Sequence, residues 1–84
     1  MTRVVIPPMG QKESHGNIGM WFKDLGEQIN KGDILCTFET EKASVEIEAP
    51  CSGVLKLILF PRDAEVSVGD CIAIIAEADE DVSL

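Results

Sequence analysis

Long apolar runs are absent from this 84-residue sequence. No stretch approaches 18 uninterrupted apolar residues, the length that a membrane-spanning helix needs. The chain opens on Met1-Thr2-Arg3 and continues directly into Val4-Val5-Ile6, with no apolar signal core and no cleavage site. We therefore expect neither a transmembrane helix nor a secretory peptide. A cytoplasmic location fits the chain, and a mitochondrial matrix location fits it if a transit segment has been removed.

Basic residues are scarce. Seven Lys and Arg stand against 15 Asp and Glu, which gives a formal net charge of −8 at pH 7. Such a charge repels nucleic acid and anionic membranes and attracts proteins that carry basic patches. The expected partner is therefore a protein, with no nucleic acid and no membrane involved. The length allows one small domain without room for a substrate cleft.

Paired cysteines are also lacking. Cys36, Cys51 and Cys71 are odd in number and show no C-x-x-C spacing, which argues against a disulfide framework and against a zinc site. Cys36 falls on an inward strand position and is expected to be a small core hydrophobe. A nucleophilic pair with His15, the only histidine, is disfavoured because nothing marks a pocket or a third, orienting group. We expect His15 to lie in a loop before Gly16.

Phosphate-binding glycine loops and helical patterns are missing as well. Neither G-x-G-x-x-G nor G-x-x-x-x-G-K-[ST] occurs, so nucleotide binding has no support. Gly and Pro recur too often for a helix. The dipeptides Gly32-Asp33 and Gly69-Asp70 are expected to form turns, because Gly permits positive φ and Asp can bond nearby amides. An independent enzyme is the least favoured class of protein.

What the sequence does contain is an internal repeat. A shift of 37 positions superposes Gly16 on Gly53, Ile18 on Leu55, Ile29 on Val66, Gly32-Asp33 on Gly69-Asp70, and Leu35 on Ile72. Each copy has one apolar face, which it can bury only against the other copy. We therefore predict an all-β fold: a sandwich or flattened barrel of two roughly four-stranded sheets with a pseudo-two-fold internal repeat.

The first copy continues into a second recognisable feature, a hairpin around Lys42. Strand-like alternation precedes it in residues 34–39 and follows it in residues 45–49, where Glu46 and Glu48 alternate with apolar residues. The segment Thr40 to Ser44 remains for the turn, although it contains no Gly, Pro, Asn or Asp. This asymmetry between the copies places the hairpin at one end of the molecule and both termini near the other.

Lys42 is the only basic residue between Lys31 and Lys56, so it stands alone among carboxylates at the predicted tip. Two interpretations are open. It could be a solvated surface lysine that balances local negative charge, which is the ordinary role of an exposed lysine. Alternatively, it could be an attachment point for a covalently bound group.

Four segments recur together in one known family. They are Gly16-Asn17-Ile18, Ile29-Asn30-Lys31-Gly32-Asp33, Glu39-Thr40-Glu41-Lys42-Ala43-Ser44-Val45-Glu46 and Ala49-Pro50-Cys51-Ser52-Gly53. Together they resemble the lipoyl domain of the acyltransferase (E2) components of 2-oxo acid dehydrogenase complexes, from about Val4 to Glu77. Glu41 replaces the Asp that is usual in the family and keeps its charge. The segment Glu13-Ser14-His15-Gly16 replaces the family's acidic-Gly lead-in.

The resemblance implies a lipoyl carrier domain over residues 1–77, followed over residues 78–84 by an acidic tail or the start of an interdomain linker. Lys42 would carry lipoic acid through an amide bond and display it as a swinging arm that shuttles acyl groups and electrons. The domain itself would not be an enzyme, whereas its parent protein would be a dihydrolipoamide acyltransferase.

Recognition residues are implied in the same way. Glu39 and Gly53 match positions that the family uses for recognition by the lipoylating enzyme. The neighbouring residues Glu41, Ala43 and Glu46 are further candidates for contacts with that enzyme or with partner enzymes. No metal site is implied.

The implied partners are a lipoate-protein ligase or lipoyl transferase, a thiamine-diphosphate E1, an E2 acyltransferase core with coenzyme A, and a flavoprotein E3. The isolated domain would be monomeric. A biotin carrier is one alternative, but its modified lysine characteristically lies between methionines, whereas Lys42 lies between Glu41 and Ala43. The lipoylated glycine-cleavage carrier is usually longer, with helical sequence that this chain lacks. An unmodified acidic docking module is the third alternative.

Overall fold

The computed structural model of the chain describes residues 1–8 and 15–82. Glu13 and Ser14 of the Glu13–Gly16 lead-in and the end of the predicted acidic tail lie outside the described residues. Eight strands are present: β1 (Thr2–Val5), β2 (His15–Trp21), β3 (Gln28–Ile29), β4 (Ile34–Glu39), β5 (Ser44–Glu48), β6 (Gly53–Ile58), β7 (Glu65–Ser67) and β8 (Cys71–Ala76). The described residues form no helix that is long and apolar enough to cross a membrane.

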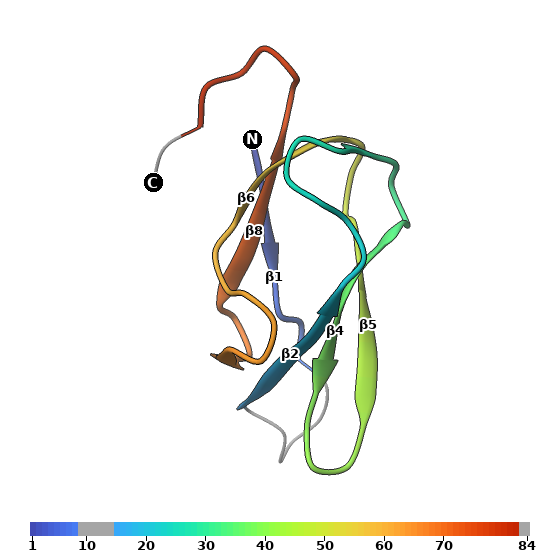
Figure 1. Cartoon of the computed structure of the whole chain (residues 1–84), viewed down its shortest axis with the longest axis vertical. Coiled ribbons are helices and arrows are strands. Elements are labelled where there is room, and N and C mark those ends of the chain that lie inside the picture. The colour runs from blue at the N-terminus through green and yellow to red at the C-terminus, as the bar shows by residue number, and fades with distance from the viewer. Residues whose placement is uncertain (9–14, 83–84) are drawn as a thin grey trace.

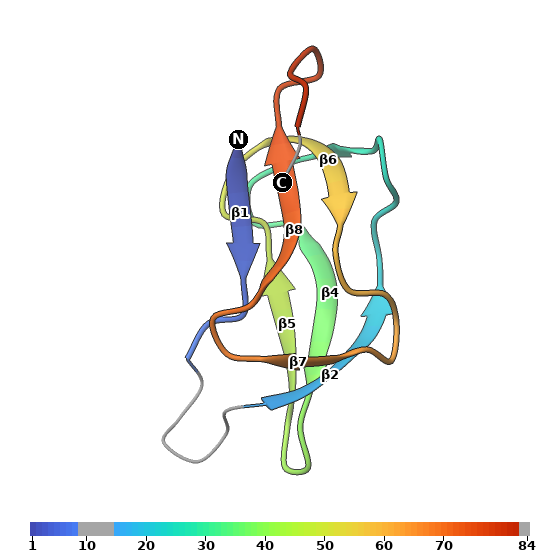
Figure 2. The same cartoon turned by 90° about the vertical axis from the view of Figure 1, so that its left-hand side faces the viewer.

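The strands form two four-stranded sheets whose described pairings are antiparallel, in the orders β1-β8-β6-β3 and β5-β4-β2-β7. The sheets face each other in an elongated sandwich of 39 × 23 × 20 Å (Figure 1; Figure 2 shows the same fold from the side). The predicted all-β class and the two four-stranded sheets are confirmed. Each sheet draws two strands from each half of the chain, so the halves interleave.

The predicted pseudo-two-fold repeat is visible in the topology. Replacing β1–β4 by β5–β8, and the reverse, converts one sheet order into the other. The turns repeat as well: the Asn30 N–H donates to Asp33 Oδ2 and the Ser67 N–H donates to Asp70 Oδ2, both at 2.8 Å. The glycine before each aspartate has φ of 92°. The two Gly-Asp dipeptides therefore form the turns that the sequence predicts, because only glycine adopts this φ without strain.

The space between the sheets is filled by apolar side chains only. No polar or charged side chain is buried among the described residues. One contiguous cluster of buried residues forms the core: Val4, Ile6, Ile18, Ile29, Leu35, Cys36, Phe38, Ile47, Ala49, Leu55, Val66, Ile72, Ala73 and Ile75. Both halves contribute to it, so the burial that stabilises one half also stabilises the other.

β4 departs from the period-2 alternation that the sequence suggests, and β8 does so in the same way. In β4, Ile34 and Cys36 lie opposite successive residues of β5, so Leu35 is an extra residue in a β-bulge. Leu35 and Cys36 are consequently both fully buried. Ile72, the repeat equivalent of Leu35, is skipped in the same way where β8 pairs with β1, and it is also fully buried. The bulge is therefore a feature of both copies.

Candidate functional site

The β4–β5 hairpin projects from one end of the sandwich, and the start of β1 and the end of β8 lie toward the other (Figure 1). β4 ends at Glu39 and β5 begins at Ser44, which leaves a four-residue connection with Glu41 and Lys42 at its tip. The predicted hairpin and its position relative to the termini are thus confirmed.

Thr40 closes this turn. Its N–H donates to the Ala43 carbonyl at 2.8 Å. Its hydroxyl oxygen Oγ1 accepts hydrogen bonds from the N–H groups of Lys42 and Ala43 at 3.3 and 3.1 Å. Asp63 is the only non-glycine residue with positive φ among those described, so the tip is not one of the primed turns that require Gly or Asn. A threonine hydroxyl substitutes for the missing turn residues here.

Lys42 is exposed at the tip, as are Glu41, Ala43 and Ser44. Within the described part of the chain, every ion pair uses either the Met1 ammonium or Lys23, and none involves Lys42. An exposed amine on a short, hydrogen-bonded turn is accessible to a modifying enzyme. The arrangement therefore suits covalent attachment of an acyl group.

The outer face of the β5-β4-β2-β7 sheet is rich in carboxylates. The strand register sets Glu39 directly between Asn17 of β2 and Ser44 of β5. Along the same face lie four exposed glutamates, each on a strand of this sheet: Glu39, Glu46, Glu48 and Glu65. The structure thus brings Glu39, Glu41, Ala43 and Glu46 of the predicted recognition set together around Lys42. Clustered like charges produce a local potential that attracts a basic partner surface.

Gly19 gives the Glu39 side chain room on this face, and its role was not foreseen from the sequence. A Cβ atom at Gly19 would lie 2.7 Å from Glu39 Oε2 and would also meet Thr37 Oγ1. The Glu39 carboxylate therefore lies across the β2 backbone. A glycine inside a strand often marks such a close approach, which is the signal that could have identified it.

A shallow depression of about 460 Å³ adjoins the hairpin. Its lining comes from β2, the hairpin and one residue before β7: His15, Gly16, Asn17, Glu39, Thr40, Glu41 and Asp63. The expected loop position of His15 is wrong: this residue begins β2, because it pairs with Ser67 of β7. Asp63 was also missed, although the repeat aligns it with Gly26 and both have positive φ.

The structure separates Cys36 from His15. Cys36 lies opposite Trp21 at the far end of β2 from His15, about 20 Å away along a strand of this length. Burial raises the pKa of the Cys36 thiol to about 12. A buried, protonated thiol is inert, so Cys36 is the core hydrophobe that the sequence predicts and not half of a catalytic pair.

Gly53 is the one predicted recognition residue that the structure does not bring near Lys42. It begins β6, at the end of the sandwich opposite the hairpin (Figure 2). A Cβ atom at this position would lie 2.7 Å from Ile75 Cγ2 and 2.9 Å from the Ala76 carbonyl oxygen. Close packing against β8 thus accounts for a glycine here, and its role in recognition stays a prediction.

The chain is similar in sequence to known proteins. A biotin/lipoyl family model, described as "Biotin-requiring enzyme", matches residues 2–75. The dihydrolipoyllysine-residue acetyltransferase component of the pyruvate dehydrogenase complex from Zymomonas mobilis is 38% identical over 81 residues, which cover 95% of this chain and 18% of that protein. The dihydrolipoyllysine-residue acetyltransferase component of the acetoin cleaving system from Pseudomonas putida is 35% identical over 80 residues, which cover 95% of this chain and 22% of that protein. The chain thus spans about a fifth of the length of these relatives.

The fold also occurs among solved structures. The solution structure of the lipoyl domain of the 2-oxoglutarate dehydrogenase complex from Azotobacter vinelandii matches with a TM-score of 0.72, over 90% of this chain and 98% of that one. Its sequence identity to this chain is 22%, so this structural similarity shows the fold alone.

Proposed function

This chain belongs to the biotin/lipoyl family, and we propose that within it the chain is a lipoyl carrier domain with lipoic acid joined to Lys42 through an amide bond. One observation carries the proposal: Lys42 is an exposed lysine without an ion-pair partner among the described residues, at the tip of a four-residue hairpin and at the end of the molecule opposite the termini. Any linker that continues from the domain would leave it at the other end, so the arm would be free to reach partner enzymes.

The residues around Lys42 favour lipoic acid over biotin. Glu41 and Ala43 flank the lysine, whereas biotin carriers characteristically have methionines there. The proposed recognition residues Glu39, Glu41, Ala43 and Glu46 all belong to the hairpin or to its strands. A modifying enzyme could therefore contact them while the lysine occupies its active site.

The domain's own residues present and position the arm. The hydrogen bonds of Thr40 hold the tip in one conformation, and the carboxylates on the adjoining sheet face supply the charge that partner enzymes recognise. Lipoic acid, when attached, supplies a dithiolane that takes part in thiol–disulfide exchange and carries acyl groups. Tethering the dithiolane to a domain raises its effective concentration at each partner site.

We propose further that the chain is part of a dihydrolipoamide acyltransferase, because the curated relatives named above are such components and the chain spans about a fifth of them. Its partners would then be a lipoate-protein ligase or lipoyl transferase, a thiamine-diphosphate E1, an acyltransferase core that uses coenzyme A, and a flavoprotein E3. The compartment would be the cytoplasm, or the mitochondrial matrix in a eukaryote.

The decisive experiment is the intact mass of the protein after incubation with lipoate-protein ligase, lipoic acid and ATP. We expect one lipoyl increment on the wild-type chain and none on Lys42→Arg, which keeps the charge but removes the primary amine. The matched control is Lys56→Arg, which should gain one increment like the wild type.

Parallel incubation with biotin ligase, biotin and ATP separates the two carriers. A biotin increment without a lipoyl increment would replace the lipoyl proposal by a biotin carrier. No increment from either enzyme, under conditions that modify a known lipoyl domain, would favour an unmodified docking module. A lipoyl increment that persists in Lys42→Arg would refute Lys42 as the site.

A further inference from the structure

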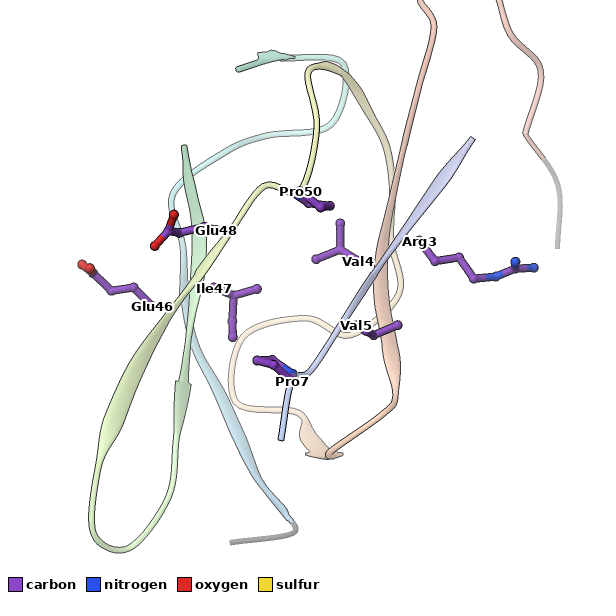
Figure 3. Close-up of a pocket in the computed structure, with 8 residues that line it drawn as sticks. All are labelled: Arg3, Val4, Val5, Pro7, Glu46, Ile47, Glu48 and Pro50. Atoms are coloured by element: carbon purple, nitrogen blue, oxygen red, sulfur yellow. The ribbon is translucent and has the colours of Figure 1, made fainter. Parts of the chain in front are cut away.

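A groove lies between the edge strands β1 and β5, apart from the depression beside the hairpin (Figure 3). Its volume is about 350 Å³. The two walls contribute equally: Arg3, Val4, Val5 and Pro7 on the β1 side, and Glu46, Ile47, Glu48 and Pro50 on the β5 side. The residues of the two walls correspond at a constant shift of 43 positions, from Arg3 and Glu46 to Pro7 and Pro50. This shift differs from the 37 positions of the internal repeat, but β1 and β5 are equivalent edge strands of the two sheets, so the groove lies between two equivalent edges.

Apolar side chains and carboxylates line different parts of this groove. Figure 3 shows Val4 and Ile47 pointing between the two strands, while Glu46 and Glu48 point outward on the β5 side. The prolines at the groove are exposed. Val4 and Ile47 themselves are buried, with 2% and 4% of their surface exposed, so a chain lying along β5 would meet the exposed Pro7 and Pro50 on one of its sides and carboxylates on the other.

The backbone of β5 also has free hydrogen-bonding groups on its outer edge. β5 pairs with β4 alone in the described structure. Ala43 and Ala49, which bracket β5, form backbone hydrogen bonds of 2.8 to 2.9 Å with residues on the β4 side. Because bonded and non-bonded residues alternate in an antiparallel pair, the N–H and C=O groups of Glu46 and Glu48 point away from β4.

We propose that the β5 edge of this groove binds an extended, basic segment of a partner protein, which adds to the sheet as an antiparallel strand. Addition of a strand to a free edge is an established mode of peptide recognition. Lys or Arg residues of the segment lie directly opposite Glu46 and Glu48, and the apolar residues between them lie over the groove, beside the exposed Pro7 and Pro50. Arg3 on the other wall disfavours the same segment on the β1 edge.

The negative charges on β5 also disfavour binding of a second copy of this chain at the β5 edge. Two β5 edges paired antiparallel would set carboxylates against carboxylates, which is destabilising. Charged residues on an edge strand are a common protection against self-association. The same glutamates therefore exclude another acidic edge and accept a basic one.

The test is an NMR titration of the isotope-labelled 84-residue chain with a capped Lys-Val-Lys-Val-Lys-Val peptide. We expect the largest amide shifts in residues 44–48. In the proposed register the lysine N–H groups point toward β5 and the valine N–H groups point away. A peptide N-methylated at its lysines should therefore bind about tenfold more weakly, whereas one N-methylated at its valines should bind within about twofold of the parent.

Two double variants of equal charge provide the protein-side control. Glu46→Gln with Glu48→Gln should weaken binding of the parent peptide about fivefold, and Glu65→Gln with Glu77→Gln should change it by less than about twofold. Equal losses in the two double variants would overturn the proposal in favour of non-specific charge attraction. Equal binding of the two methylated peptides, or largest shifts outside residues 44–48, would also overturn it.

Discussion

At the scale of single residues, burial and close packing distinguish residues of the same type that the sequence alone does not distinguish. The three cysteines differ in this way: Cys36 is fully buried, whereas Cys51 and Cys71 are partly exposed. Gly53 is constrained by its contact with β8, and Gly19 by the Glu39 carboxylate. Sequence reasoning identified the buried cysteine from its strand position, but it could not identify the atoms that approach each glycine.

The raised pKa of Cys36 predicts a loss of stability at alkaline pH. The folded-state pKa is about 12, compared with 9.0 for an unperturbed thiol. The thiol's contribution is complete below the unfolded-state pKa and is lost as the pH rises toward the folded-state pKa, because only the unfolded state releases the proton. Between pH 8 and pH 10 we expect the free energy of unfolding to fall by about 1 to 2 kcal/mol more in the wild type than in Cys36→Val.

Urea unfolding of both proteins under reducing conditions at the two pH values measures this difference. Cys71→Val is the matched control and should lose as much as the wild type. Equal pH dependence of the wild type and Cys36→Val would show that the buried thiol is not responsible.

At the scale of elements, the position of the hairpin was predictable from the sequence, but the hydrogen bonds that form its turn were not. The alternation of Val45, Ile47 and Ala49 identified β5, and the lone lysine identified the tip. The reason for the turn was less visible, because no Gly, Pro, Asn or Asp is present. The signal was Thr40, whose hydroxyl bonds to the following amides and so offers the backbone a local turn.

Removal of the Thr40 hydroxyl should loosen the hairpin without unfolding the domain. Thr40→Val is nearly isosteric but cannot accept the hydrogen bonds of the Lys42 and Ala43 amides. We expect a loss of about 1 kcal/mol in stability and faster hydrogen exchange at the Ala43 amide. Thr40→Ser should retain most of the wild-type protection. If Thr40→Val exchanged as slowly as the wild type, the hydroxyl would not be what orders the tip.

At the scale of the whole molecule, the two halves cannot be separated. β1 and β3 pair with β8 and β6, and β2 pairs with β7, so every sheet contains strands from both repeats. A side-chain contact joins them as well, since Trp21 Nε1 donates to the Phe60 carbonyl at 2.9 Å. Loss of either half would leave the other with unpaired strand edges and an open core.

We therefore expect a single cooperative unfolding transition despite the internal repeat. The fluorescence of Trp21 and the far-UV circular dichroism signal should follow the same urea curve, with a free energy of unfolding on the order of 4 to 13 kcal/mol for a chain of this length. Two separate midpoints would indicate that the halves unfold independently.

The local features of this protein can be inferred from its sequence. Alternating apolar residues specify strands, the repeated Gly-Asp dipeptides specify turns, and the lone Lys42 among carboxylates specifies a candidate attachment site, because each depends on neighbouring residues. Only the three-dimensional fold shows which strands pair outside the β4–β5 hairpin, why Leu35 is buried on a bulge and which residues of β1 and β5 form a common groove. These depend on contacts between residues far apart in the chain, and local periodicity carries no information about the partner of a strand.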